Sequence, residues 1–260
     1  RLFAEVLEAS APLVVVVGDD VATQLTKGDL EAAVDRSGEG AAVPPRDTRI
    51  GDLGALLAQP WAPVRPKAVN EIRSHGAVEW VFANGTRVLF APSLIASGQV
   101  ELWAESQGGH SLLAPGDSAL VDAATAAVDG SGVGTFDGVE VRGFEDAEGI
   151  SLTSYIDHTT EGFIGSARAT TLESLFSLLY MTVTDPRVDG PALAEALEYL
   201  HTLEQLPEKD AEVASLVAAR QLRFGEVPHL RRVPTSEQVA SFTAETALSM
   251  FEERLGKVDD

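Results

Sequence analysis

The sequence predicts an α+β fold in which an antiparallel or mixed sheet is covered on one face by helices. Short segments with the two-residue period of half-buried strands recur between residues 78 and 167. From residue 170 the apolar spacing changes to the helical period of 3.6 residues and keeps it to about residue 255. Strands followed by a run of helices are typical of a two-layer α+β domain.

The strands are expected at Val78–Ala83, Thr86–Pro92, Val100–Ser106, Ile150–Asp157 and Glu161–Ala167. Asn84-Gly85 between the first two favours a two-residue hairpin turn, because both turn positions need φ > 0. Trp80 and Trp103 occupy strand positions, where we expect them to pack on a sheet face. An exposed aromatic ring there would instead suit the wall of a peptide-binding site.

Helices are expected at Asp117–Val128, near Phe136–Arg142, from Thr170 to Thr184, after Asp189, and at Lys209–Leu222, Ser236–Phe242 and Ala244–Leu255. Thr170 and Glu173 have the spacing of a capping box, and Asp189 is expected to cap the next helix. Two apolar faces are predicted: Leu120, Ala123, Ala124, Ala127 and Val128 on one helix, and Leu172, Leu175, Phe176, Leu179 and Val183 on another.

Three regions are expected along the chain. Residues 1–52 show a helical face at Leu2–Leu7, a buried strand at Leu13–Val17 and a short helix at Thr26–Val34, too little to close a core alone. This region is expected to be the C-terminal tail of a preceding domain. Proline and glycine disfavour regular structure over 35–76, apart from a short helix near Asp52–Leu57, and 53–76 is assigned as a linker. Residues 77–258 are expected to form one compact unit.

Composition narrows the classes of function. The chain has 19 basic and 40 acidic residues and a net charge of -21, which disfavours binding to nucleic acid. Such a surface favours cationic peptides in a cleft, although its first effect is on solubility. Cysteine is absent, so thiol chemistry and Cys-type zinc sites are excluded. No apolar run is long enough to cross a bilayer, and a soluble chain with the cytoplasm as the favoured compartment is expected.

The order of elements from Val78 to Phe136 resembles the insulinase-like (pitrilysin-type, inverzincin) zinc metallopeptidases. A strand, Asn84-Gly85 and a second strand lead to a third strand that ends at Gly108-Gly109, and a helix follows Gly116. In active members that helix carries His-x-x-Glu-His, with two zinc ligands and a general base. Here the matching octapeptide is GDSALVDA, with alanine at both histidine positions and aspartate at the glutamate position: Ala119, Asp122 and Ala123.

The resemblance implies a processing-peptidase-like domain that is catalytically inactive in this chain. The usual third zinc ligand is a glutamate on a later helix, for which Glu195 and Glu198 are the nearest candidates. Without the imidazoles neither has a metal to complete, so we assign no catalytic, cofactor-binding or metal-binding residue. Zinc is expected only in an active domain of the parent chain, upstream of Arg1.

The implied role is that of a third quarter, the opening domain of the second half of a larger zinc metallopeptidase. Its partners would be sister peptidase domains of the same polypeptide, and it would help to enclose and bind peptide substrate. One alternative is a scaffold or interaction subunit whose parent has no active half and which partners a separate active subunit. A further alternative is an independent enzyme of unrecognised chemistry.

Other candidate residues have simpler explanations. The five histidines include no pair at i and i+4, and His110, just before the altered motif, is expected in a loop or at a sheet edge. The glycines of 130–134 follow a helix and precede no Lys-Ser/Thr, so a flexible helix exit is favoured over a phosphate loop. Four arginines are expected to complement a helix C-terminus and nearby carboxylates: Arg220, Arg223, Arg231 and Arg232.

Overall fold

The computed structural model describes residues 26–39, 64–93, 97–114, 117–224 and 233–256. The chain divides into two units, Arg1–Asp47 and Thr48–Asp260. The described part of the first unit is the helix α3 (Lys27–Glu39), which confirms the helix predicted at Thr26–Val34 and extends it. Thr26 and Asp29 exchange hydrogen bonds at its start. The elements predicted at Leu2–Leu7, Leu13–Val17 and Asp52–Leu57 lie outside the described residues.

The second unit begins, among its described residues, with a three-stranded antiparallel sheet. Its strands are β1 (Ala68–Ile72), β2 (Ala77–Val81) and β3 (Arg87–Phe90), in that order. The first strand corrects the expectation of a linker without regular structure over residues 53–76. No proline follows Pro66 before this strand, so every residue of β1 keeps its N–H, and Ala68–Ile72 pairs with β2 along its whole length.

The hairpin between β2 and β3 is present, but its loop is one residue longer than predicted. The Phe82 N–H donates to the Thr86 carbonyl at 2.9 Å, and the Gly85 N–H donates to the Phe82 carbonyl at 3.2 Å. Ala83, Asn84 and Gly85 therefore form a three-residue loop, the kind that ends on a left-handed residue. Gly85 supplies that conformation with φ 92°.

A second antiparallel sheet forms the body of the unit. It has the strands β4 (Gln99–Gln107), β5 (Ser151–Ile156) and β6 (Thr160–Arg168), in the order β4-β6-β5. The five predicted strands are thus confirmed, with ends shifted by one or two residues, and are shared between two sheets.

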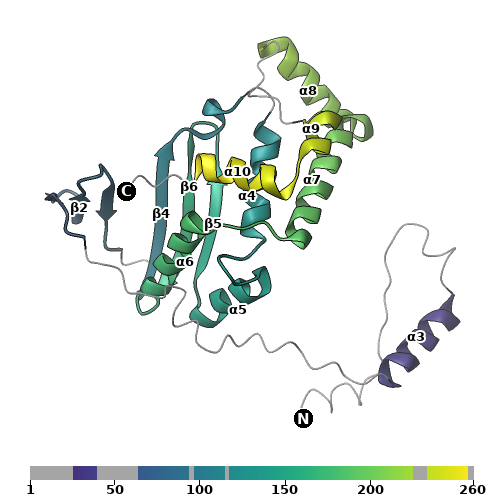
Figure 1. Cartoon of the computed structure of the whole chain (residues 1–260), viewed down its shortest axis with the longest axis horizontal. Helices are drawn as coiled ribbons and strands as arrows, with labels where there is room; N and C mark the ends of the chain where they lie inside the picture. Colours follow the sequence, from purple (N-terminus) through teal and green to yellow (C-terminus); the bar gives the residue numbers. More distant parts are fainter. Residues whose placement is uncertain (1–25, 40–63, 94–96, 115–116, 225–232, 257–260) are drawn as a thin grey trace. The chain divides into compact units, whose positions relative to one another are not determined.

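Helices cover one face of this second sheet, as predicted (Figure 1). They are α4 (Ser118–Asp129), α6 (Leu172–Thr184) and α10 (Ala244–Arg254). Alternate strand residues pack against the buried side chains of these helices: Leu102, Ala104, Leu152, Ile156, Phe163 and Ala167. All six lie on the same side of the pleat, and on the opposite side Trp103 and Ile164 are exposed.

Four further helices of the described residues lie beside this layer (Figure 1). They are α5 (Gly138–Glu148), α7 (Gly190–Lys209), α8 (Ala211–Phe224) and α9 (Ser236–Ser241). The inward face predicted for α4 is confirmed, since Leu120, Ala123, Ala124, Ala127 and Val128 are all buried. Part of that face packs on Ala196 and Leu200 of α7.

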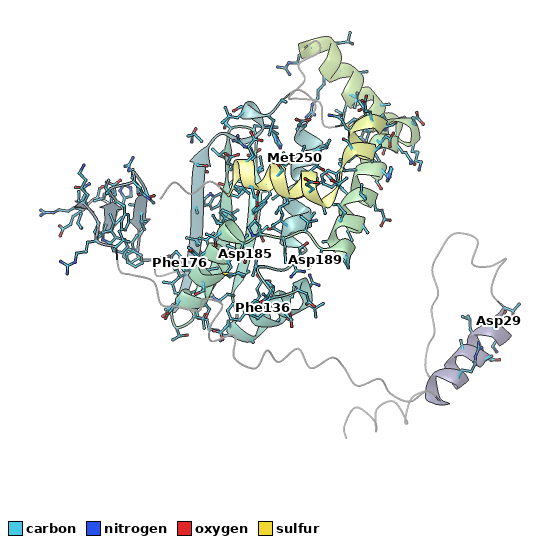
Figure 2. All side chains as sticks on the ribbon, viewed as in Figure 1. Asp29, Phe136, Phe176, Asp185, Asp189 and Met250 are labelled. Atoms are coloured by element: carbon cyan, nitrogen blue, oxygen red, sulfur yellow. The ribbon has the colours of Figure 1, made fainter. Side chains whose placement is uncertain are left out.

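Of the two predicted helix caps, one stands at a different residue and the other makes no capping hydrogen bond. The N-cap of α6 is Thr171, not Thr170, and no side chain caps it. Asp189 does stand at the N-cap of α7, but its carboxylate accepts from the Arg187 guanidinium at 2.8 Å instead of capping the helix. Figure 2 labels this aspartate beside α7. A nearby guanidinium outcompetes the neutral N–H groups of the first turn, because charge-assisted hydrogen bonds are stronger.

One residue of the apolar face predicted on α6 is also wrong. Phe176, labelled in Figure 2, is 37% exposed, whereas Leu178 is buried in its place. The helix is apolar on more than one side, so the sequence period alone selected the wrong edge of its buried face.

The glycine-rich turn after α4 is closely packed, which corrects the expectation of a flexible exit. A Cβ at Gly132 would lie 1.7 Å from the Phe136 carbonyl oxygen, and Val133 is buried. The Gly134 N–H donates to the Asp185 carbonyl at 2.9 Å. Glycine is required at 132 by the close approach of backbone, not by a need for mobility.

Candidate functional site

The altered zinc motif lies on the first turns of α4. Ala119 and Ala123 are 1% and 0% exposed, and they pack in the cluster that contains Leu200, Phe242 and Ala247. Zinc ligands in proteins are nitrogen, sulfur or oxygen atoms, and two buried methyl groups supply none of these. The side chains present at these two positions therefore do not fit a zinc ion.

The candidate third ligands point elsewhere. Glu195 and Glu198 are exposed on α7, whereas Ala196 and Leu200 of the same helix are buried toward α4. Across the ranges that the structure describes, no group of three or more His, Asp or Glu side chains could hold a metal ion. That this chain has no catalytic or metal-binding residue stays a prediction.

Asp122, at the general-base position, is engaged in a hydrogen bond. The His110 Nε2 lies 2.8 Å from the Asp122 Oδ1. The histidine is 3% exposed and sits on the short 3-10 helix η2 (Gly109–Leu112), which corrects the expectation of a loop or edge position. The carboxylate thus anchors a buried imidazole, which accounts for it without a metal.

The Gly108-Gly109 turn at the end of β4 is held by a buried ion pair. The Arg254 Nε, from the last turn of α10, donates to the Glu161 Oε2 at 2.9 Å, and the Gly109 N–H approaches the same oxygen at 3.2 Å. Gly109 has φ 60°, and a Cβ there would lie 2.2 Å from the Asp157 carbonyl oxygen. Packing and charge pairing therefore explain the Gly108-Gly109 pair, one of the features on which the family resemblance rests.

The face of the second sheet opposite the helices offers a different kind of site. We define the open face by its central side chains: Glu101, Trp103 and Glu105 on β4, Thr153 and Tyr155 on β5, and Ile164 on β6. Trp103 is 67% exposed, so the expectation that it is packed is wrong. Trp103 is instead the exposed aromatic ring of the alternative expectation.

The two aromatic rings of the open face form one unit across β6. The rings of Trp103 and Tyr155 meet edge to face, with centroids 6.2 Å apart. The Trp103 Nε1 donates to the Tyr155 hydroxyl at 3.1 Å, and that hydroxyl donates to the Glu105 Oε2 at 3.2 Å. Burial of the hydroxyl and the nearby carboxylate raise the pKa of Tyr155 above its ordinary value, so it remains a donor near neutral pH.

The outer edge of β5 is occupied by two carboxylates. The Ser154 N–H donates to Asp129 at 3.0 Å, and the Leu152 N–H donates to Glu145 at 3.1 Å. The Ser154 hydroxyl also donates to Asp129, at 2.6 Å. Desolvation raises the pKa of Asp129 to about 6, against these hydrogen bonds. Satisfied N–H groups make this edge a poor template for a further strand.

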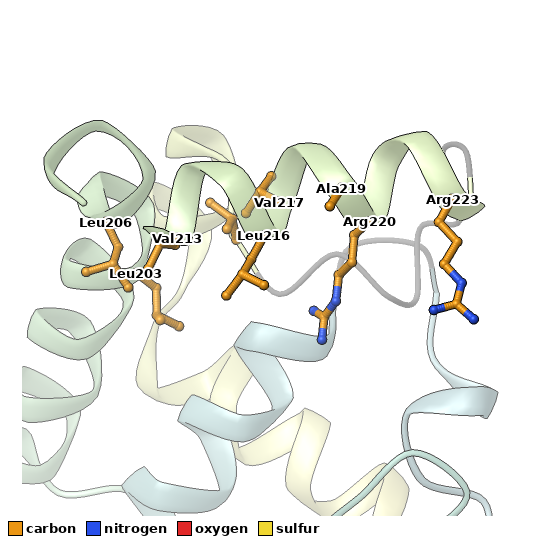
Figure 3. A pocket seen from close by; sticks show the side chains of 9 residues that line it. Leu203, Leu206, Val213, Leu216, Val217, Ala219, Arg220 and Arg223 are labelled. Atoms are coloured by element: carbon orange, nitrogen blue, oxygen red, sulfur yellow. The ribbon is translucent and has the colours of Figure 1, made fainter. Parts of the chain in front are cut away.

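A groove of about 420 Å³ lies along α8 (Figure 3). Its wall is mostly apolar, with Leu203 and Leu206 from α7 and Val213 and Leu216 from α8. The guanidinium groups of Arg220 and Arg223 line one end of it. These two arginines occupy the last turns of α8, as predicted, and Arg231 and Arg232 lie outside the described residues.

Comparisons with known proteins agree with this fold. No family model matches the chain. It is 26% identical over 160 residues to the probable zinc protease PqqL of Haemophilus influenzae, a match that covers 62% of this chain and 17% of that protein. Within the ranges that the structure describes, no helix is long and apolar enough to cross a membrane.

Several solved structures are similar, among them the following three. The periplasmic protease PqqL of Escherichia coli aligns with a TM-score of 0.68 and 19% identity, over 92% of this chain and 26% of that chain. A mutant of the ferredoxin protease FusC, in complex with Arabidopsis ferredoxin, aligns with a TM-score of 0.65 and 21% identity, over 89% and 25%. An M16 peptidase inactive domain from Pseudomonas fluorescens aligns with a TM-score of 0.52 and 16% identity, over 67% and 42%.

The chain thus spans 17% to 42% of the length of these proteins. Their names do not support the cytoplasm as compartment, since one of the relatives is periplasmic. All three structures are peptidases or peptidase domains, and one of them is an inactive domain. The resemblance predicted from the sequence is therefore confirmed: the chain is similar to the insulinase-like (M16) zinc peptidases and has the fold of their domains, an inactive one among them.

Proposed function

We propose that this chain is a non-catalytic domain of a larger zinc metallopeptidase and that its open face forms part of a substrate-enclosing wall. The observation that carries the proposal is the exposed Trp103, hydrogen-bonded to the half-buried Tyr155, on a peptidase fold whose motif positions hold alanine. Trp103 and its neighbour Ile164 are both exposed, and contiguous exposed apolar side chains often mark a surface that binds a partner. Zinc would be held by another domain of the parent chain.

Two further features support the proposal. The carboxylates at the β5 edge discourage strand addition at that edge, and the open face offers aromatic and acidic side chains for contact with a peptide. The chain also spans only about a quarter of the PqqL structure, so sister domains of the same polypeptide are the expected partners.

Metal analysis of the purified chain tests the first half of the proposal. We expect less than one zinc per ten molecules after dialysis against zinc-containing buffer. Stoichiometric zinc that is lost on Asp122→Ala or Glu198→Ala would contradict a non-catalytic role.

Peptide binding tests the second half. Fluorescence polarisation with labelled nonapeptides of varied charge should detect binding at micromolar to millimolar concentration, and Trp103→Ala should weaken it. If no peptide binds, the scaffold alternative is favoured. The parent reading frame upstream of Arg1 should then also lack His-x-x-Glu-His.

A further inference from the structure

The open face combines its aromatic pair with acidic groups in a regular row. Glu101, Trp103 and Glu105 alternate along β4, so neighbouring side chains of this row are separated by about 7 Å. Both glutamates are exposed residues, and Ile164 stands directly opposite Trp103 on β6. The row therefore presents a carboxylate, an indole ring and a second carboxylate, and the apolar side chain of Ile164 lies beside the indole.

The single basic residue of this part of the sheet lies away from the row. Arg168 stands opposite Gln99, the first residue of β4, and its guanidinium lies against Gly149, which precedes β5. The charged side chains that flank Trp103 along β4 are the two glutamates, in a chain of net charge -21.

From this row we infer that the open face binds extended cationic segments in which two basic residues flank an apolar residue at alternate positions. The inference rests on the proposed peptide-binding function and names its substrate class. An extended chain repeats its side chains every ~7 Å on one side, which matches the row. The apolar side chain would lie on Trp103 and Ile164. Each cation would pair with one glutamate and lie close to the face of the indole ring, which attracts cations.

Fluorescence polarisation on the full 260-residue chain tests this. Three labelled nonapeptides share one length: one with the pattern Lys-x-Leu-x-Lys, one with Glu-x-Leu-x-Glu, and one with the same lysines and leucine placed consecutively. We expect the alternating basic peptide to bind at least fivefold more tightly than the consecutive one, and the acidic peptide to show no binding.

Variants locate the binding. Glu101→Gln/Glu105→Gln should weaken binding of the alternating basic peptide about three- to tenfold at 50 mM salt. The effect should be smaller at 0.5 M salt, where the Debye length falls to about 4 Å. Trp103→Ala should weaken it about tenfold. The matched control is Glu195→Gln/Glu198→Gln, which removes the same charge from exposed positions on α7 and should leave binding unchanged. Melting temperatures check that each variant is folded.

The outcomes separate the two proposals. If no peptide binds, the peptide-binding function itself fails. If all three peptides bind alike and Trp103→Ala weakens each, the function stands and the inferred preference is wrong. If the α7 control weakens binding as much as the β4 pair does, net charge and not the row selects the peptide, and the inference is again overturned.

Discussion

Ala119 and Ala123 lie one turn apart on α4, where their methyl groups fill space shared with α7 and α10. At the scale of single residues, these positions therefore lack zinc-binding atoms and are also filled by the packing of the core. The surrounding core packs closely around the two methyl groups, so imidazoles at these positions would require neighbouring side chains to move apart.

The double substitution Ala119→His/Ala123→His tests this closure. We expect each histidine to lower the free energy of unfolding by about 1–3 kcal/mol, because overpacking forces side chains and backbone to shift. We also expect no tight zinc binding. Urea unfolding and zinc titration calorimetry measure the two effects.

Ala126→His is the matched control, since Ala126 is exposed on the same helix. It should change stability by less than about 0.5 kcal/mol. Zinc affinity in the micromolar range or better for the double variant, with stability unchanged, would show that the motif positions remain open to metal.

At the scale of elements, charged side chains fix how helices and strands meet. Glu161 on β6 and Arg254 on α10 form an ion pair whose side chains are 5% and 12% exposed. The same glutamate accepts from the Gly109 N–H, so one side chain connects a strand, a helix and the first residue of η2.

Glu161→Ala should therefore destabilise the chain by about 3–5 kcal/mol, because it leaves a buried guanidinium without its counter-ion. Glu71→Ala removes the partner of Arg73 in an exposed pair and should cost less than about 1 kcal/mol. Urea-unfolding midpoints compare the two. Equal effects would mean that the Glu161–Arg254 pair is not buried in solution.

The carboxylates along β5 predict a pH dependence. The pKa of Asp129 is raised from 3.8 to about 6, so between these values the folded state binds more protons than the unfolded state. This group's contribution is therefore present at low pH and is lost as the pH rises through about 6. The carboxylate of Asp129 lies against Ser154 on β5, which desolvates it, but the residue as a whole is exposed and solvent screening keeps the effect small.

Asp129→Asn removes this titration and keeps one acceptor for the Ser154 N–H. Relative to the wild type, the variant should be more stable at pH 7.5 than at pH 4.5, measured by thermal unfolding at both values. Glu195→Gln, on the surface of α7, should show a smaller change in this difference. A variant that tracks the wild type across the whole range would exclude Asp129 as the titrating group.

At the scale of the whole molecule, the chain divides at residues 47 and 48. Removing Arg1–Asp47 should leave the unfolding of Thr48–Asp260 cooperative, with a midpoint within about 2 °C of that in the full chain. Differential scanning calorimetry measures this. Loss of the cooperative transition would show that the two units depend on each other for folding.

The sequence predicted most of the second unit because its signals are local. Alternation located the five strands, the helical period located α4, and Gly85 located the hairpin. The sequence-based prediction failed where the structure of a residue depends on contacts with neighbouring strands or charged side chains. β1 was missed because prolines dominate the stretch before it, and Asp189 was assigned a cap because Arg187 was not seen as its partner.

The candidate site was predictable only in part. The alanines of the motif are visible in the sequence, and so is the alternation of Glu101, Trp103 and Glu105. Their exposure is not, because a strand has two equivalent faces until helices cover one. Tyr155 lies 52 residues from Trp103, and no local pattern joins them.

The sequence by itself determined the fold class and the absence of imidazoles at positions 119 and 123, since both follow from residue types and periods along the chain. Only the tertiary structure decided that His110 pairs with Asp122, that carboxylates close the β5 edge and that Trp103 faces outward. These contacts join residues 12 to 52 positions apart, and which of them form depends on which face of the sheet the helices bury.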